Sequence, residues 1–173
     1  MLPKLTFVLG GAASGKSAWA ENLLLSSGLE PVYVATSRIF DDEIKKKVSI
    51  HRSRRNDDWS TLEADIDLSD ALSGLIAGQV ALVDCATMWL TNHMLDGKDL
   101  GEATNQLLAA IDTCDAPVVV VSNEVGQGIV PDNALARSFR EAQGRLNIKL
   151  AHKANLAVEI KAGLPMVLKG KLV

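Results

Sequence analysis

Short, unbroken runs of apolar residues recur along the chain, each flanked by polar or turn-forming residues. Strands buried on both faces of a parallel sheet show runs of this kind, whereas half-exposed strands alternate apolar and polar positions. The runs therefore predict buried strands. They lie at residues 5–9, 31–35, 80–84 and 117–122, with weaker candidates at 156–160 and 166–168.

Helical spacing appears between these runs, where apolar residues recur every three or four positions. The expected faces are Ala20, Leu23 and Leu24 within 17–25, and Leu68, Leu72, Leu75 and Ile76 within 68–76. A longer helix is expected over 132–153 with Asp132 as its N-cap, and 94–102 reads as a loop between helices. This alternation indicates an α/β layer fold with right-handed crossovers, and no linker divides residues 1–173 into two domains.

Composition narrows the class of protein. The chain has 173 residues, 47% of them hydrophobic, and a net charge of -3, which argues against a general nucleic-acid binder. Cys85 and Cys114 have no metal-ligand spacing and are expected to be small buried hydrophobes. Gly-Gly ends the first apolar run short of a signal-peptide core, and no run approaches the roughly 18 residues that span a bilayer. The expected location is the cytoplasm.

The residues GGAASGKS form the most specific motif in the chain. They fit G-x-x-x-x-G-K-[ST], with Gly10, Gly15, Lys16 and Ser17 at the defining positions, between a predicted strand and a predicted helix. In such a loop the backbone N–H groups surround phosphate oxygens, and the helix N-terminus adds positive potential. Lys16 would reach the β- and γ-phosphates and Ser17 would bind Mg²⁺. The alternative is a glycine-rich turn that only connects strand to helix.

Asp84 ends the predicted strand 80–84 and is the candidate for a second metal ligand. P-loop enzymes hold their metal with the loop hydroxyl and an acid at the end of a neighbouring strand. The alternative is an ordinary helix cap, and spacing alone does not separate the two. The presence of the P-loop favours the metal-binding interpretation.

The segment DDEIKKKVSIHRSRR carries a candidate nucleophile. If it is helical, Ile44, Val48 and His51 fall on one face, and the neighbouring Arg52, Arg54 and Arg55 surround the histidine. A neutral imidazole is a good nucleophile, and arginines would lower its pKa and neutralise phosphate charge. Such a histidine could form a covalent phosphoramidate. The alternatives are a solvated helix face and a hydrogen-bonded core histidine.

Taken together, the motifs resemble the bifunctional adenosylcobinamide kinase / adenosylcobinamide-phosphate guanylyltransferase family. The resemblance runs nearly end to end, and the order and spacing of the blocks make it specific. The blocks are LGGAASGKSAWAE, VYVATSRIFDDEI, HRSRRNDDWSTLE, VDCATMWLTN, SNEVGQGIVPDNALARSFREAQGRLN and the tail AGLPMVLKG.

The resemblance implies a fold and two reactions. The fold is a P-loop NTPase-like three-layer α/β fold with a mostly parallel, RecA-like central sheet. The reactions are phosphorylation of adenosylcobinamide by ATP or GTP, then transfer of GMP from GTP through a histidine to give adenosyl-GDP-cobinamide. The resemblance also implies Mg²⁺ as cofactor, a homotrimer, and a corrinoid as partner substrate.

By position, the family's guanylylated histidine corresponds to His51. The nucleotide-binding residues implied by the resemblance include the loop positions Gly11, Ala12, Ala13 and Ser14, with Thr36, Ser37, Arg55, Glu63 and Asp84 beyond the loop. Since the chain has one P-loop and no second nucleotide motif, one site is expected to serve both reactions.

Three positions depart from the family pattern. Ala13 stands where arginine is usual, Ile148 where glutamine is usual, and Gln127 where an aromatic residue is common. Two other functions remain open at this point. One is a single-step P-loop kinase for a small metabolite, in which His51 only packs or faces substrate. The other is a nucleotide-dependent switch without turnover, which would change its ordered segments with the γ-phosphate.

Overall fold

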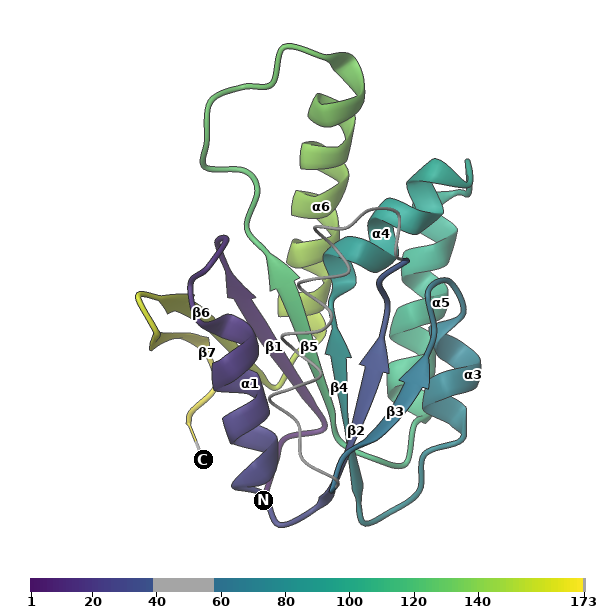
Figure 1. Ribbon diagram of the computed structural model, residues 1–173, viewed down its shortest axis with the longest axis vertical. Helices are drawn as coiled ribbons and strands as arrows, with labels where there is room; N and C mark the ends of the chain where they lie inside the picture. Colours follow the sequence, from purple (N-terminus) through teal and green to yellow (C-terminus); the bar gives the residue numbers. More distant parts are fainter. Residues whose placement is uncertain (39–57, 173) are drawn as a thin grey trace.

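The computed structural model describes residues 1–38 and 58–172, which form a central sheet with helices on both faces (Figure 1). The sheet has seven strands in the order β3-β2-β4-β5-β1-β6-β7. The strands are β1 (Leu5–Gly10), β2 (Glu30–Ala35), β3 (Ser60–Glu63), β4 (Gln79–Asp84), β5 (Val118–Asn123), β6 (Leu156–Lys161) and β7 (Leu164–Lys169). All neighbouring pairs are parallel except β6 and β7, which form an antiparallel hairpin. The mostly parallel sheet expected from the apolar runs is confirmed.

The inner strands β1, β2, β4, β5 and β6 are buried on both faces, as their unbroken apolar runs predict. Successive residues point to opposite faces, so that in β1 Phe7 packs into one apolar cluster and Val8 into the other. The cluster around Phe7 receives side chains from four helices. These helices are α3 (Leu68–Ser73), α4 (Ala86–Leu95), α5 (Leu100–Thr113) and α6 (Ala134–Lys153). The cluster around Val8 receives Ala20 and Leu24 from α1 (Lys16–Leu25).

One strand and one connection differ from expectation. The edge strand β3 shows no apolar run because all four of its residues are exposed, so only its pairing with β2 reveals it. The predicted loop 94–102 is much shorter, because α4 continues to Leu95 and α5 begins at Leu100. The side chain of Asp99 accepts a hydrogen bond from the Glu102 N–H and so starts α5 inside the polar stretch.

Two helix ends also differ. The helix predicted over 68–76 stops at Ser73, and Ile76 lies in the following turn with 63% of its surface exposed, so it does not share the buried face of Leu68 and Leu72. The last long helix starts at Ala134 rather than at 132. Its N-cap is Asn133, whose side chain accepts from the Ala136 N–H at 2.8 Å, and not Asp132.

Both cysteines are buried and unbridged, as predicted. In the part of the chain that the structure describes, no helix is both long and apolar enough to cross a bilayer.

Candidate nucleotide-binding site

The glycine-rich motif forms the connection between β1 and α1, at the carboxyl edge of the sheet (Figure 1). Gly10 is the last residue of β1, and a Cβ on it would lie 2.4 Å from Ser14 Oγ and 2.9 Å from the Ile160 carbonyl oxygen. Ser14 Oγ can rotate away, but the backbone carbonyl of Ile160 cannot, so this close approach requires glycine. The Ser14 N–H closes the turn on the Gly11 carbonyl at 3.3 Å, and Lys16 Nζ donates to that carbonyl at 3.0 Å. Lys16 is also the first residue of α1.

The β6–β7 hairpin supports this loop from the side. Its turn has Ala162 and Gly163 at positive φ, 51° and 79°, the backbone of a tight two-residue hairpin turn. The Gly163 N–H donates to the Ser14 carbonyl at 2.8 Å. The tail AGLPMVLKG supplies the turn and the second strand of this hairpin, which therefore holds the middle of the glycine-rich loop although about 150 residues separate the two in the chain.

Asp84 lies at the same edge of the sheet, at the end of β4. Its carboxylate accepts a hydrogen bond from the Tyr33 hydroxyl at 3.3 Å. Burial lowers the pKa of Lys16, and the nearby Cys85 and Asp84 oppose that shift. Burial, helped by Asp84, raises the pKa of the Cys85 thiol to about 11, so the thiol is protonated at neutral pH and is not a nucleophile. The ammonium of Lys16 and the carboxylate of Asp84 thus face a common site.

Thr36 follows β2 directly and is hydrogen-bonded to Cys85, which follows β4, next to that site. Its hydroxyl donates to the Cys85 carbonyl and accepts from the Cys85 N–H, both at 2.8 Å, while its own carbonyl accepts from Asn92. The Asp84–Cys85 peptide bond between these contacts is cis. With its hydroxyl engaged in this way, Thr36 positions the turn after β4.

Glu63 shares one row of the sheet with Asp84. In the parallel register, Ala35 of β2 pairs with Glu63 on one side and with Asp84 on the other. Two strand spacings separate the two acids, about 10 Å. Glu63 is exposed, and Ser37 follows Thr36 directly beyond β2. The structure therefore brings the P-loop, Asp84, Ser37 and Glu63 to one edge of the sheet.

The two predicted residues of the basic segment, His51 and Arg55, lie outside the described residues. Arg38, the last described residue before that segment, is hydrogen-bonded to two acidic side chains. Arg38 donates from its two terminal nitrogens to Asp96 at 2.8 and 2.9 Å, and from Nε to Asp65. These acids hold the pKa of the guanidinium above its usual range.

Sequence reasoning missed three residues of the site. Tyr33 donates to Asp84, Gly163 donates to the P-loop, and Cys85 influences Lys16, each across a long separation in the chain. The turn-forming pair Ala162-Gly163 was the one available signal, and it predicts a hairpin without indicating what the turn contacts.

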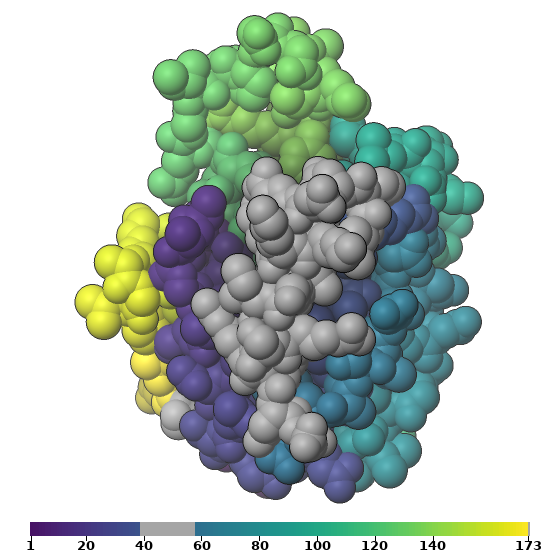
Figure 2. Space-filling view, in the orientation of Figure 1, coloured from purple at the N-terminus to yellow at the C-terminus, as the bar shows by residue number. Residues whose placement is uncertain are grey.

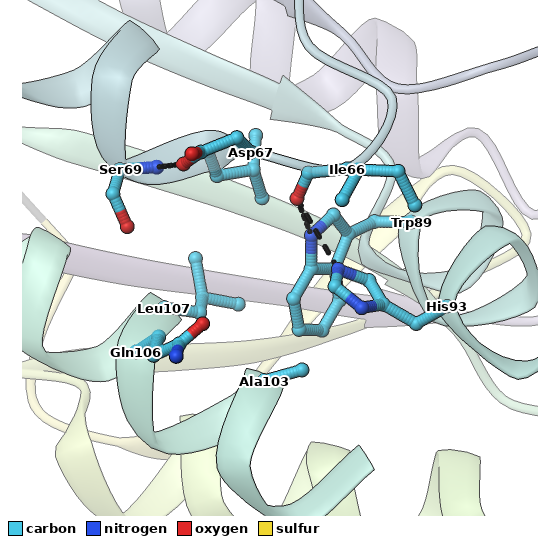
Figure 3. Close-up of a pocket in the computed structure, with 9 residues that line it drawn as sticks. Ile66, Asp67, Ser69, Trp89, His93, Ala103, Gln106 and Leu107 are labelled. Atoms are coloured by element: carbon cyan, nitrogen blue, oxygen red, sulfur yellow. Dashed lines mark hydrogen bonds between the residues drawn. The ribbon is translucent and has the colours of Figure 1, made fainter. Parts of the chain in front are cut away.

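A separate small pocket of about 90 Å³ lies between α3, α4 and α5 (Figure 3). Trp89 Nε1 and His93 Nε2 both face the Ile66 carbonyl oxygen there, at 2.8 and 3.2 Å, and their rings stand 4.4 Å apart. Among the residues that the structure describes, no predicted site residue lines this pocket. The phosphate-binding loop and the pocket are therefore distinct features.

A glycine-rich loop that passes into a helix N-terminus with its lysine, at the carboxyl edge of a parallel sheet, defines a P-loop nucleotide-binding protein. The model of the family described as cobinamide kinase / cobinamide phosphate guanyltransferase matches residues 6–168. The chain belongs to this family.

Curated relatives agree over most of the chain. The bifunctional adenosylcobalamin biosynthesis protein CobP of Pseudomonas aeruginosa is 40% identical over 167 residues, which cover 95% of this chain and 96% of that protein. CobU of Escherichia coli (strain K12), which has the same descriptive name, is 38% identical over 181 residues, covering 95% and 99%.

Solved structures support the fold. A type III secretion system ATPase superimposes with a TM-score of 0.56 at 8% identity, covering 94% of this chain and 56% of that chain. This likeness bears on the fold alone, and it agrees with the P-loop NTPase-like, RecA-like fold predicted from the sequence.

Proposed function

We propose that this protein phosphorylates adenosylcobinamide with ATP or GTP, and then transfers GMP from GTP to that phosphate to give adenosyl-GDP-cobinamide. The observation that carries the proposal is the P-loop with Lys16 and Asp84 at one site, in a chain that matches the family along residues 6–168. ATP and GTP are the nucleotide substrates and the corrinoid is the acceptor. Because both nucleotides are cytoplasmic metabolites, we place the enzyme in the cytoplasm.

The phosphoryl step needs positioning and charge neutralisation more than covalent chemistry by the protein. Backbone N–H groups of the loop from Gly10 to Ser17 would bind phosphate oxygens, and Lys16 would neutralise charge that develops on the β- and γ-phosphates. Ser17 and Asp84 are the residues that would hold Mg²⁺, which supplies further charge neutralisation when bound. Their oxygen donors suit this hard cation.

The guanylyl step proceeds through His51 in this proposal. A nitrogen of its neutral imidazole attacks the α-phosphorus of GTP, an N–P bond forms, and the bond to the bridging oxygen breaks as pyrophosphate leaves. A phosphate oxygen of the corrinoid then attacks the same phosphorus and releases the histidine. Arg55, four residues along the chain, would neutralise phosphate charge, and the P-loop would stabilise the leaving pyrophosphate.

The remaining nucleotide contacts are assigned by position. Ser37 and Glu63 would lie beside the nucleoside, with Thr36 beneath them, because the three share the carboxyl edge of β2 and β3. We also propose a homotrimer, on the family resemblance.

The intermediate can be tested with GTP labelled at the α-phosphate. The expected result is an acid-labile, base-stable protein adduct, present in the wild type and absent from His51→Ala. His152→Ala, which changes an exposed histidine of α6, is the matched control and should keep the label.

Kinase activity on cobinamide is measured in parallel on all three proteins. Phosphorylation without any adduct in the wild type would support a single-step kinase instead. GTP binding with no turnover of cobinamide would contradict both reactions and leave the nucleotide-dependent switch.

A further inference from the structure

The connection between β5 and α6, residues 124–133, stands above the carboxyl edge of the sheet together with the first turn of α6 (Figure 1). Figure 2 shows this region as a separate lobe at one end of the molecule. We call residues 124–133 the overhanging loop. Its base adjoins the phosphate site, because the Glu124 N–H donates to the Gly10 carbonyl at 3.0 Å and Asn123 pairs with Gly10 across the sheet.

Large apolar side chains of this lobe point into solvent. Ile129 is 97% exposed and Val130 66%, and Leu135 in the first turn of α6 is 60% exposed. Isolated exposed apolar residues are common on proteins, whereas a group of three on one projecting element indicates a surface that binds something.

The backbone of the overhanging loop is held from behind by two arginines of α6. Arg137 Nη1 donates to the carbonyls of Pro131 and Asp132, each at 2.9 Å. Arg140 donates to the carbonyls of Ile129 and Gly126. Four carbonyls of the loop thus accept hydrogen bonds from guanidinium groups, while the apolar side chains stay exposed. A loop braced in this way presents its side chains without first having to be ordered.

The position of this apolar surface beside the phosphate site points to the acceptor of both reactions as its occupant. Both proposed reactions take place at the phosphate site, so the acceptor molecule must lie beside the P-loop at the carboxyl edge of the sheet. A cobinamide offers a wide macrocycle whose rim carries methyl and methylene groups, and its reacting hydroxyl sits at the end of a flexible side chain. When that hydroxyl reaches the P-loop, the ring has to rest on a neighbouring surface, and the first residue of the overhanging loop, Glu124, is hydrogen-bonded to Gly10.

We propose that Ile129, Val130 and Leu135 form a platform that binds the corrin ring of the acceptor during both reactions. This inference rests on the proposed function and adds to it a site for the acceptor, separate from the nucleotide contacts. The arginines Arg137 and Arg140 are positioning residues, since they act by holding the loop.

The test is a double variant, Ile129→Ser with Val130→Ser, compared with Ile148→Ser. Ile148 is an exposed residue of α6 with 62% of its surface in solvent, outside the lobe, and it serves as the matched control. Because the double variant removes two exposed apolar side chains that the corrin ring would cover on binding, the KM for cobinamide should rise at least tenfold. The KM for GTP should change less than twofold in every variant.

A second pair of variants tests the bracing. Arg140→Gln should raise the KM for cobinamide several-fold, whereas Arg145→Gln, which removes only the exposed pair with Glu141, should leave it unchanged. An Arg140→Lys variant that recovers part of the affinity would support a role in holding carbonyls, because lysine also donates hydrogen bonds.

Equilibrium dialysis of cobinamide, followed by corrin absorbance without nucleotide, separates this inference from the proposed function. Weaker binding in the double variant supports the platform. Wild-type turnover with unchanged KM and unchanged dialysis in the double variant overturns the platform and leaves the function intact. A wild type that neither binds nor phosphorylates cobinamide overturns both.

Analytical ultracentrifugation of each variant is the last experiment. A lower oligomeric state of a variant would overturn the platform, because it would show that the loop contacts a second copy of the chain.

Discussion

Among single residues of the site, Lys16 combines burial with the need to stay charged. Burial lowers its pKa, and the nearby Cys85 and Asp84 offset part of this shift. Bound phosphates would raise the pKa again, because several negative charges then surround the ammonium. The proton on Lys16 is therefore linked to nucleotide binding.

This linkage predicts a pH dependence of affinity. A group whose pKa is higher in the complex than in the free protein favours binding fully below its free pKa, and this contribution is lost as the pH rises from the free pKa to the pKa in the complex. The dissociation constant of GTP should thus increase on the alkaline side, before the ordinary lysine pKa of 10.5 is reached. Isothermal titration calorimetry between neutral pH and about pH 10 measures it.

Lys16→Met provides the comparison. This variant should bind GTP at least tenfold more weakly at neutral pH, because one charge-assisted contact is lost. Its affinity should also vary little with pH over the same range. An equally steep pH dependence in the variant would show that another group, and not Lys16, titrates.

At the scale of elements, the β6–β7 hairpin is part of the nucleotide site. Its turn residue Gly163 donates its N–H to Ser14 in the middle of the P-loop, and it does so with φ at 79°. A side chain there would meet open space, so backbone strain alone decides what the position tolerates.

We expect Gly163→Val to weaken GTP binding by roughly tenfold, because a β-branched residue disfavours positive φ and the strained turn withdraws its donor. Gly163→Asn should stay within a few-fold of the wild type, since asparagine tolerates this conformation.

Gly97→Val is the matched control. Gly97 also has positive φ and open space, yet it lies between α4 and α5. Its substitution should lower the Tm and leave GTP affinity unchanged, and equal loss of affinity in both valine variants would contradict the role of the turn.

Strands were predictable from the sequence where the local pattern of apolar residues reflects burial. The strands β1, β2, β4, β5 and β6 coincide with unbroken apolar runs, because both of their faces are covered. β3 was not predictable, since its exposed residues S-T-L-E carry no periodic signal and the strand exists through its pairing with β2. In the polar stretch 94–102 the end of α4 and the start of α5 were not predicted. The stretch has the composition of a loop, yet the side-chain cap at Asp99 starts α5 within it.

Residues of the site were likewise predictable only where a local sequence pattern marks them. The P-loop and Asp84 are recognisable because each depends on a short motif or on a strand end. The contacts of Tyr33, Cys85 and Gly163 depend on which strands become neighbours, and no local pattern contains that information. The role of His51 stays a prediction, since it rests on the family resemblance and lies outside the described residues.

For the molecule as a whole, the two faces of the sheet are covered unequally in the part that the structure describes. Four helices pack on the face of Phe7, and α1 packs on the face of Val8, where Leu24 is fully buried. Because α1 also carries Lys16 and Ser17, packing on this face and nucleotide binding should be coupled.

Leu24→Ala tests the coupling. Removing a fully buried leucine should cost about 2–5 kcal/mol of unfolding free energy and lower the Tm in proportion. A nucleotide at a hundred times its dissociation constant contributes about 2.7 kcal/mol, so saturating GTP should restore much of the Tm. Differential scanning fluorimetry with and without GTP measures both values. A Tm that does not respond to GTP in this variant would mean that the cavity has disrupted the site itself.

The position of β1 has a consequence for synthesis of the chain on the ribosome. β1 is translated first, yet its two neighbours in the sheet are β5 and β6, and the donor to its loop is Gly163. These partners emerge only after more than a hundred further residues. The nascent protein must therefore carry its glycine-rich loop unpaired until those partners have emerged, and its capacity to hold a nucleotide arises only after they have joined the sheet.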